Sequence, residues 1–248
     1  MKQLLFLFSI FLISCSDGAL NEVQGDEPAT DNSAGAEIPE GSSNNVEPNN
    51  NTPTENASNP TETEAALYLA SNGLTVKAGT LASIGDRIEF NGNEYLVVDN
   101  STLRDIVKND REILTYLVTS FVTDMSYLFE GRQTLTPNIG GWDTSQVQNM
   151  SYLFNGANIY NGDISQWDTS QVNNMSYMFA GASLYNRDLG DWNTAQVTQM
   201  DGMFYEASIF NQNLSSWCVN LITEAPTDFS RLSALTNNFL PTWGSCPD

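Results

Sequence analysis

The sequence repeats itself with a 25-residue period between positions 117 and 216, and this period limits the possible folds more than any other feature. The recurring side chains are Trp142, Trp167, Trp192 and Trp217; Val122, Val147, Val172 and Val197; Met125, Met150, Met175 and Met200; Phe129, Phe154, Phe179 and Phe204; Ile139, Ile164, Leu189 and Leu214; and Asn161, Asn186 and Asn211. A unit this short cannot enclose its own apolar side chains, so successive units must stack. We therefore interpret the Trp and Met rows as a shared core and not as a cofactor site.

The pattern inside one unit, residues 167–191, predicts the local structure. Apolar residues follow helical spacing around 174–181, which begins with Asn and ends with Gly, residue types favoured at helix ends. The stretch 185–192 fits a short strand. The expected fold class is an α/β repeat solenoid, leucine-rich-repeat-like, with a short strand plus a short helix in each 25-residue turn.

The best-kept units read Trp-Asp-Thr-Ser-Gln-Val-x-Asn-Met-Ser-Tyr-(Leu/Met)-Phe-x-Gly-Ala. This motif resembles the 25-residue repeats of BspA-type bacterial surface lipoproteins, and the resemblance covers residues 67–247. It implies a surface location and, for some members, adhesion to host proteins or other cells, and it offers no catalytic residues. Gly202 and Glu206 depart from the motif, so we expect the regular coil to be ending there.

Residues 1–14 resemble a lipoprotein signal peptide. The apolar run of residues 4–13 is too short for a permanent span, and it ends in Leu-Ile-Ser-Cys, which resembles a lipobox. The resemblance implies export and lipid attachment to Cys15, with a plain cleaved signal as the alternative. We expect a protein anchored to the outer membrane and exposed at the surface, although the sequence after Cys15 leaves the leaflet open.

Residues 15–64 complete the N-terminal region as an acidic stalk. Positions 16–64 contain eleven carboxylates and no Lys, Arg or aromatic residue. So little apolar surface predicts disorder, and the stalk would act as a spacer. The alternative, folding upon a partner, lacks hydrophobic anchors.

The remaining chain divides into an N-terminal cap at 65–116, four repeats at 117–216 and a C-terminal cap at 217–248. The first cap is expected to contain a hairpin around Asn91-Gly92 and a helix at 101–109 with Ser101 as its N-cap. With Cys15 lipidated, Cys218 and Cys246 most simply form a disulfide that closes the second cap. A reactive or metal-binding thiol pair is the alternative.

Composition excludes several functions. The formal net charge is −21 and no basic patch is evident, which argues against nucleic-acid binding. There is no histidine, which removes Ser-His-Asp and Cys-His catalysis and histidine-containing zinc sites. We expect no cofactor, no resident metal, and contact with the membrane through the lipid alone.

The favoured function is an adhesion or interaction module, expected to be a monomer that binds a protein or glycan. The candidate binding surface is a row formed by Asp163, Ser165, Gln166, Asp168, Asp188, Asp191 and Asn193. Its acidic and amide groups favour a basic or hydroxyl-rich partner. A merely solvated face that keeps the repeats soluble is the plainer interpretation of the same residues.

Two alternatives use the same carboxylates. One is a structural envelope protein whose repeats are stabilised by calcium, although the glycine-rich calcium-coil signature is missing. The other is a glycosidase, because Asp163 and Asp188 would lie about 5 Å apart on adjacent turns. A periodic array offers no evident pocket and no asymmetry to separate two pKa values, so we expect no enzyme.

Overall fold

The computed structural model describes residues 65–109, 114–134 and 137–247. The chain divides into two units, 1–54 and 55–248, and every described residue belongs to the second. The predicted signal peptide, Cys15 and the acidic stalk lie outside the described residues. Within the described part of the chain, no helix is both long and apolar enough to cross a membrane.

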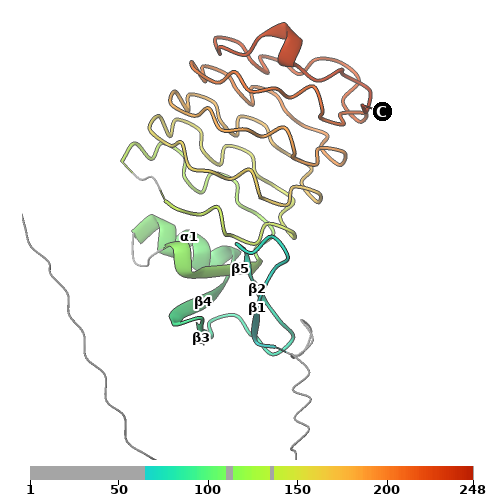
Figure 1. The fold of residues 1–248 in the computed structure, drawn as a ribbon. Helices are drawn as coiled ribbons and strands as arrows, with labels where there is room; N and C mark the ends of the chain where they lie inside the picture. Colours follow the sequence, from blue (N-terminus) through green and yellow to red (C-terminus); the bar gives the residue numbers. More distant parts are fainter. Residues whose placement is uncertain (1–64, 110–113, 135–136, 248) are drawn as a thin grey trace, which may run out of the picture. The chain divides into compact units, whose positions relative to one another are not determined.

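Regular secondary structure is concentrated before residue 122 (Figure 1). The elements are β1 (Leu67–Leu69), β2 (Val76–Ala78), β3 (Arg87–Phe90), β4 (Asn93–Asp99), α1 (Asn100–Asn109), η1 (Leu114–Tyr116), β5 (Leu117–Phe121) and η2 (Asn237–Phe239). β1 and β2 pair antiparallel, and the second sheet has the order β3-β4-β5. The expected hairpin is present, because Asn91 and Gly92 connect β3 to β4 with φ of 51° and 77°, the sign that a tight hairpin turn requires.

Helix α1 buries Leu103, Ile106 and Val107, as its spacing predicts, but its expected N-cap is wrong. Asp99 caps the helix, because its Oδ1 accepts hydrogen bonds from the Thr102 N–H at 2.8 Å and from the Ser101 hydroxyl at 3.0 Å. These bonds lower the pKa of Asp99, the backbone bond from Thr102 most of all. A carboxylate slightly earlier in the chain thus takes the place predicted for Ser101.

Strand β5 changes the predicted boundary between the cap and the repeats. The sequence places residue 117 in the first repeat, yet β5 pairs parallel with β4 and completes the sheet of the cap. Val118 packs in the small core of the cap, whereas Leu117 packs in the core that the repeats share. The N-terminal cap therefore extends to Phe121, and β5 belongs to both regions.

Between residues 122 and 232, the described chain forms turns and single bridges, so the short helix and short strand predicted in each unit are not formed. The backbone hydrogen bonds explain this difference. The N–H groups of Met175, Tyr177, Phe179 and Gly181 donate to carbonyls of the next coil at 2.7–2.9 Å. Because these N–H groups bond between coils, they cannot form the i→i−4 bonds of an α-helix. The groups between them, such as Met178 N–H, bond three residues back in tight turns.

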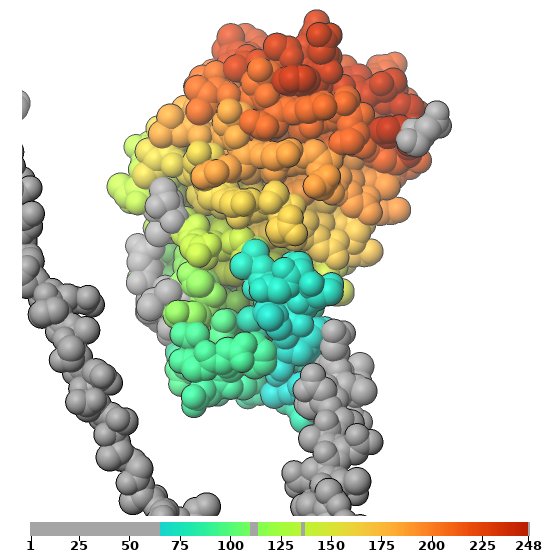
Figure 2. Space-filling model, viewed as in Figure 1, coloured from blue at the N-terminus to red at the C-terminus, as the bar shows by residue number. Residues whose placement is uncertain are grey.

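Equivalent residues of successive coils make equivalent contacts. Parallel bridges join Asp124 to Asn149, Asn149 to Asn174, and Asn174 to Gln199. The indole N–H groups of Trp142, Trp167, Trp192 and Trp217 each donate to the carbonyl 28 residues earlier, at 2.8–3.2 Å. The four tryptophans therefore point the same way, and the coils lie against one another as successive bands (Figure 2).

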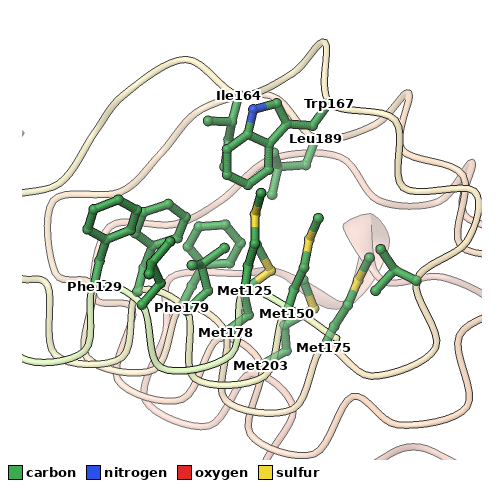
Figure 3. Close-up of a cluster of buried hydrophobic side chains, with 14 of the residues drawn as sticks. Met125, Phe129, Met150, Ile164, Trp167, Met175, Met178, Phe179, Leu189 and Met203 are labelled. Carbon is green, nitrogen blue, oxygen red and sulfur yellow. The ribbon is translucent and has the colours of Figure 1, made fainter. Parts of the chain in front are cut away.

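The core of the coils consists of continuous rows. The rings of Phe129, Phe154, Phe179 and Phe204 stack at 5.5–5.6 Å between centroids, with interplanar angles of 1–16°. Figure 3 shows Met125, Met150 and Met175 side by side in a second row, with Trp167 nearby. All of these side chains are almost completely buried, so each coil is enclosed by its neighbours and not by itself.

The coil does not end at Gly202 and Glu206, contrary to the expectation from the sequence. Gly202 has φ 59° where Tyr177 has 56°, and Glu206 has φ 57° where Gly181 has 67°. The backbone path is therefore kept although the residue types change. The N–H groups of Gly202 and Glu206 donate to carbonyls of residues 227 and 231 at 2.8 and 2.9 Å. The predicted C-terminal cap thus includes one further turn of the same form.

Candidate interaction surface

The residues predicted to form a binding row all reach the surface. Asp163, Gln166, Asp168, Asp188, Asp191 and Asn193 are exposed, and Ser165 is partly exposed. They occupy two kinds of corner, one before each Trp and one after it. The structure thus spreads the seven residues over two sets of corners on neighbouring coils.

Most of these side chains also stabilise the turn in which they lie by accepting a hydrogen bond from its backbone. Oδ1 of Asp163, Asp168 and Asp188 accepts the N–H two residues further on, at 2.9–3.0 Å, and Asn193 does the same at 3.1 Å. Such Asx turns explain why Asp and Asn recur at these positions. Turn geometry therefore already accounts for a pattern that the sequence had suggested as a ligand-binding row.

The electrostatics of Asp163 suit a stable anion. Hydrogen bonds from the Ser165 N–H and hydroxyl lower its pKa. A glycosidase general acid requires the opposite shift, so that it still carries a proton near neutral pH. Asp163 is therefore a poor proton donor for the glycosidase alternative.

A second row, which was not predicted from the sequence, consists of Tyr127, Tyr152 and Tyr177. Their rings stack at 4.7 and 4.9 Å between centroids, with interplanar angles of 6° and 15°. Tyr127 is 52% exposed, and the other two are partly exposed. Gly202 ends the row, because a Cβ there would lie 2.3 Å from the ring of Tyr177. The row therefore presents ring edges and hydroxyls to solvent, with most ring faces covered.

The backbone of the tyrosine row is unusual. Tyr127, Tyr152 and Tyr177 have φ of 60°, 57° and 56°, a left-handed conformation that costs a bulky residue about 1–2 kcal/mol. Asn or Gly would adopt it more easily, and Gly202 does so in the next coil. The 25-residue recurrence of Tyr was the available signal in the sequence, but no local rule predicts its conformation.

An apolar row also recurs on the surface. Ile159, Leu184 and Ile209 occupy equivalent positions in three coils and are 39%, 49% and 45% exposed. Single exposed apolar side chains are common on proteins, but the same exposure at one position in successive coils forms a stripe. The coils thus present acidic, aromatic and apolar rows.

A hollow lies where the N-terminal cap meets the first coil. It has a volume of about 530 Å³, and the residues that line it include Tyr68, Lys77, Ser120, Phe121, Asp143 and Gln146. Figure 2 shows the segment around β1 and β2 directly against the early coils. The hollow combines two aromatic side chains with charged and hydroxyl groups, as ligand sites commonly do.

A buried ionic network forms one wall of this hollow. Asp143, only 4% exposed, pairs with the Lys77 ammonium at 3.1 Å and accepts hydrogen bonds from Ser120 at 2.6 Å and Ser145 at 2.7 Å. Burial alone would raise the pKa of Asp143, but the two hydroxyls and Lys77 together lower it. The network fastens β2 to the first coil, and it leaves Asp143 ionised.

Cys218 and Cys246 form a disulfide in the structure, so neither is a free thiol there. Among residues 65–109, 114–134 and 137–247, no group of three or more His, Cys, Asp or Glu side chains is arranged to hold a metal ion. Cys15 lies outside the described residues.

Comparison with known proteins gives one similarity. A family model described as "Mycoplasma protein of unknown function, DUF285" matches residues 108–243, which span the coils and parts of both caps. No curated protein and no solved structure matches the chain.

Proposed function

We propose, on the premise that this chain belongs to the DUF285 family, that it is a cell-surface lipoprotein whose repeat solenoid binds a protein or glycan partner. The family match agrees with the resemblance of the sequence to BspA-like repeat proteins. The lipid anchor on Cys15, export to the outer membrane and adhesion are parts of this proposal. The stalk would hold the repeats away from the lipid surface.

The observation that carries the proposal is the stacked tyrosine row. Tyr127, Tyr152 and Tyr177 retain exposed edges despite an unfavourable backbone conformation. Tyrosine has an apolar ring and a polar hydroxyl, and it is enriched at interfaces for this reason. Repetition over successive coils makes a long, shallow surface that fits an extended partner better than a small molecule.

The test is binding of the purified full-length protein in detergent to arrays of matrix proteins and of glycans. Tyr152→Asn removes the central ring while keeping a residue that tolerates positive φ, so the coil is expected to persist. We expect at least a tenfold loss of affinity for any ligand found. Leu221→Ser, an exposed apolar residue outside the rows, is the matched control and should leave affinity unchanged.

Two outcomes would contradict the proposal. One is the absence of any ligand across both arrays, and the other is a ligand whose affinity is the same for Tyr152→Asn and the parent protein. The anchor is tested separately by labelling cells with a radioactive fatty acid. Label should appear on the parent protein and be lost from Cys15→Ala.

A further inference from the structure

A smaller hollow lies between α1 and the first coil. It has a volume of about 280 Å³ and is lined by Arg104, Lys108, Tyr127, Leu128, Glu130 and Arg132. It is separate from the 530 Å³ hollow, with which it shares no lining residue. It lies at the first ring of the tyrosine row, at the end that faces α1.

The lining is basic in a protein that is strongly acidic. The formal net charge of the chain is −21, and the described residues contain seven Lys and Arg. Three of these seven, Arg104, Lys108 and Arg132, line this one hollow, with Glu130 as the single carboxylate among the lining residues. Such a concentration attracts an anion against the field of the rest of the surface.

Two of the three cations are held in place by backbone oxygens. Arg104 donates through Nη1 to the Ser126 carbonyl at 2.6 Å, and it pairs with Asp124 at 3.2 Å. Arg132 donates through Nη2 to the Val107 carbonyl at 2.6 Å. Lys108 lies one helical turn after Arg104, is exposed, and has no ion pair with any described residue. The arginines are thus preorganised, and no described residue occupies the donors of Lys108.

Tyr127 supplies an open aromatic face. Tyr152 covers one face of its ring at 4.7 Å, Tyr127 also lines the hollow, and no other aromatic ring among the described residues stacks on it. Tyr152 and Tyr177 differ in this respect, because Tyr152 lies between two rings and Tyr177 lies between Tyr152 and Gly202. Tyr127 is therefore the member of the row whose ring face is available to a ligand.

We infer that this hollow binds the carboxylate-bearing ring of an acidic sugar, such as a uronic or sialic acid residue. The C–H face of the sugar would stack on Tyr127, whose ring face carries partial negative charge, while its carboxylate pairs with Lys108, because both Nη atoms of Arg104 already contact Ser126 and Asp124. A volume of about 280 Å³ lies just below the range for drug-sized ligands, which suits one sugar ring better than a peptide segment. The inference rests on the proposed function in one respect, which is that a surface location would bring the protein into contact with such glycans.

The experiment measures binding of the full-length protein in detergent to oligogalacturonate and to sialyllactose. The neutral controls are the methyl-esterified oligogalacturonate and lactose. We expect micromolar to millimolar binding to at least one acidic ligand, at least tenfold weaker binding to its neutral counterpart, and weakening as salt increases. The two acidic ligands distinguish a uronic from a sialic acid source.

Variants locate the site. Lys108→Gln and Tyr127→Asn should each weaken the acidic sugar at least fivefold, and Arg187→Gln, which removes an exposed cation from a later coil, should not. Melting curves identify any variant that is unfolded, and Lys108→Gln, on the exposed side of α1, leaves no buried group unpaired. The inference is overturned if neither acidic sugar binds, if Lys108→Gln binds like the parent, or if a polyglutamate peptide binds more tightly than both sugars.

Failure of this inference is distinguishable from failure of the proposed function. Tyr177→Asn alters the tyrosine row two coils away from the hollow. If an array ligand loses affinity in Tyr177→Asn while neither acidic sugar binds, the sugar site is refuted and the proposed surface function is retained. If an acidic sugar binds Tyr177→Asn as tightly as the parent protein, the sugar site is retained and recognition is confined to the hollow.

Discussion

The N-terminal cap, residues 67–121, and the coils, residues 122–232, satisfy their backbone groups in different ways. The cap uses one helix and two small sheets, in which most partners are close in sequence. Each coil bonds to the equivalent segment of the next coil, one full repeat further along the chain, and fills the remaining positions with tight turns. A cap element therefore has local sequence signals, whereas a coil depends on its neighbours for both its core and its backbone bonds.

The difference between the two regions also bears on the two hollows described above. The hollows of about 530 and 280 Å³ are both lined by residues of the cap and of the first coil. A periodic stack repeats one environment in every coil, so it forms rows of side chains. A break in the period gives one copy surroundings of its own, and the junction with the cap supplies such a break.

The largest expected effect tests whether the two regions fold together. Phe179→Ala, in the central coil, and Leu103→Ala, in α1, should lower the free energy of unfolding by about 3–5 and 2–5 kcal/mol respectively. Because one core extends from Leu103 to Phe229, we expect a single transition in urea by tryptophan fluorescence and by helical circular dichroism. Two separate transitions, each sensitive to one variant alone, would show that the cap and the coils are independent.

The next effect probes the junction. Asp143→Asn should lower the free energy of unfolding by about 3 kcal/mol at pH 7, because the partly buried Lys77 loses its partner. The folded-state pKa of Asp143 is lowered, so the carboxylate stabilises the fold above its ordinary pKa, and this stabilisation is lost as pH falls through the folded-state value. Unfolding curves of variant and parent should therefore converge in strong acid.

Asp168→Asn is the matched control for the junction. Asp168 occupies the equivalent position one coil later, where it is exposed. Its variant should change the free energy of unfolding by less than about 0.5 kcal/mol, because Asn also forms the Asx turn. Equal effects of Asp143→Asn and Asp168→Asn would contradict a special role for the junction.

The smallest expected effect is a gain in stability inside the coils. The buried hydroxyls of Tyr160 and Tyr185 have no hydrogen-bond partner among the described residues, and Phe210 occupies the equivalent position in the next coil. Tyr160→Phe should raise the free energy of unfolding by about 1 kcal/mol, since an unsatisfied hydroxyl leaves the core. The reverse change, Phe210→Tyr, should lower it, and urea titration measures both. A loss of stability in Tyr160→Phe would indicate that the hydroxyl is satisfied.

Much of the architecture could be read from local and periodic signals. The hairpin at Asn91-Gly92 and the buried side of α1 follow from turn chemistry and helical spacing. The helix predicted at 174–181 failed, because helical spacing also fits a series of tight turns when the N–H groups find partners in another coil. The sequence does not reveal that competition, since those partners lie almost a whole repeat away along the chain.

The candidate sites also differ in how far the sequence predicted them. The acidic row was visible in the sequence, although Asx turns account for much of it. The tyrosine row repeats at the same 25-residue step but was missed, because an exposed Tyr with positive φ follows no propensity rule. The two hollows combine residues from both sides of the cap–coil junction, so no single motif contains either of them.

By itself, the sequence determined which side chains recur and therefore which of them stack, because a fixed interval places each side chain against its counterpart. It did not determine the environment of any one copy. Asp143 and Asp168 both lie in Trp-Asp-Thr-Ser-Gln-Val, yet only Asp143 is buried and paired with Lys77. Only the tertiary structure decided this difference, because β2 and β5 of the cap cover the first coil, and burial and charge depend on neighbours in space.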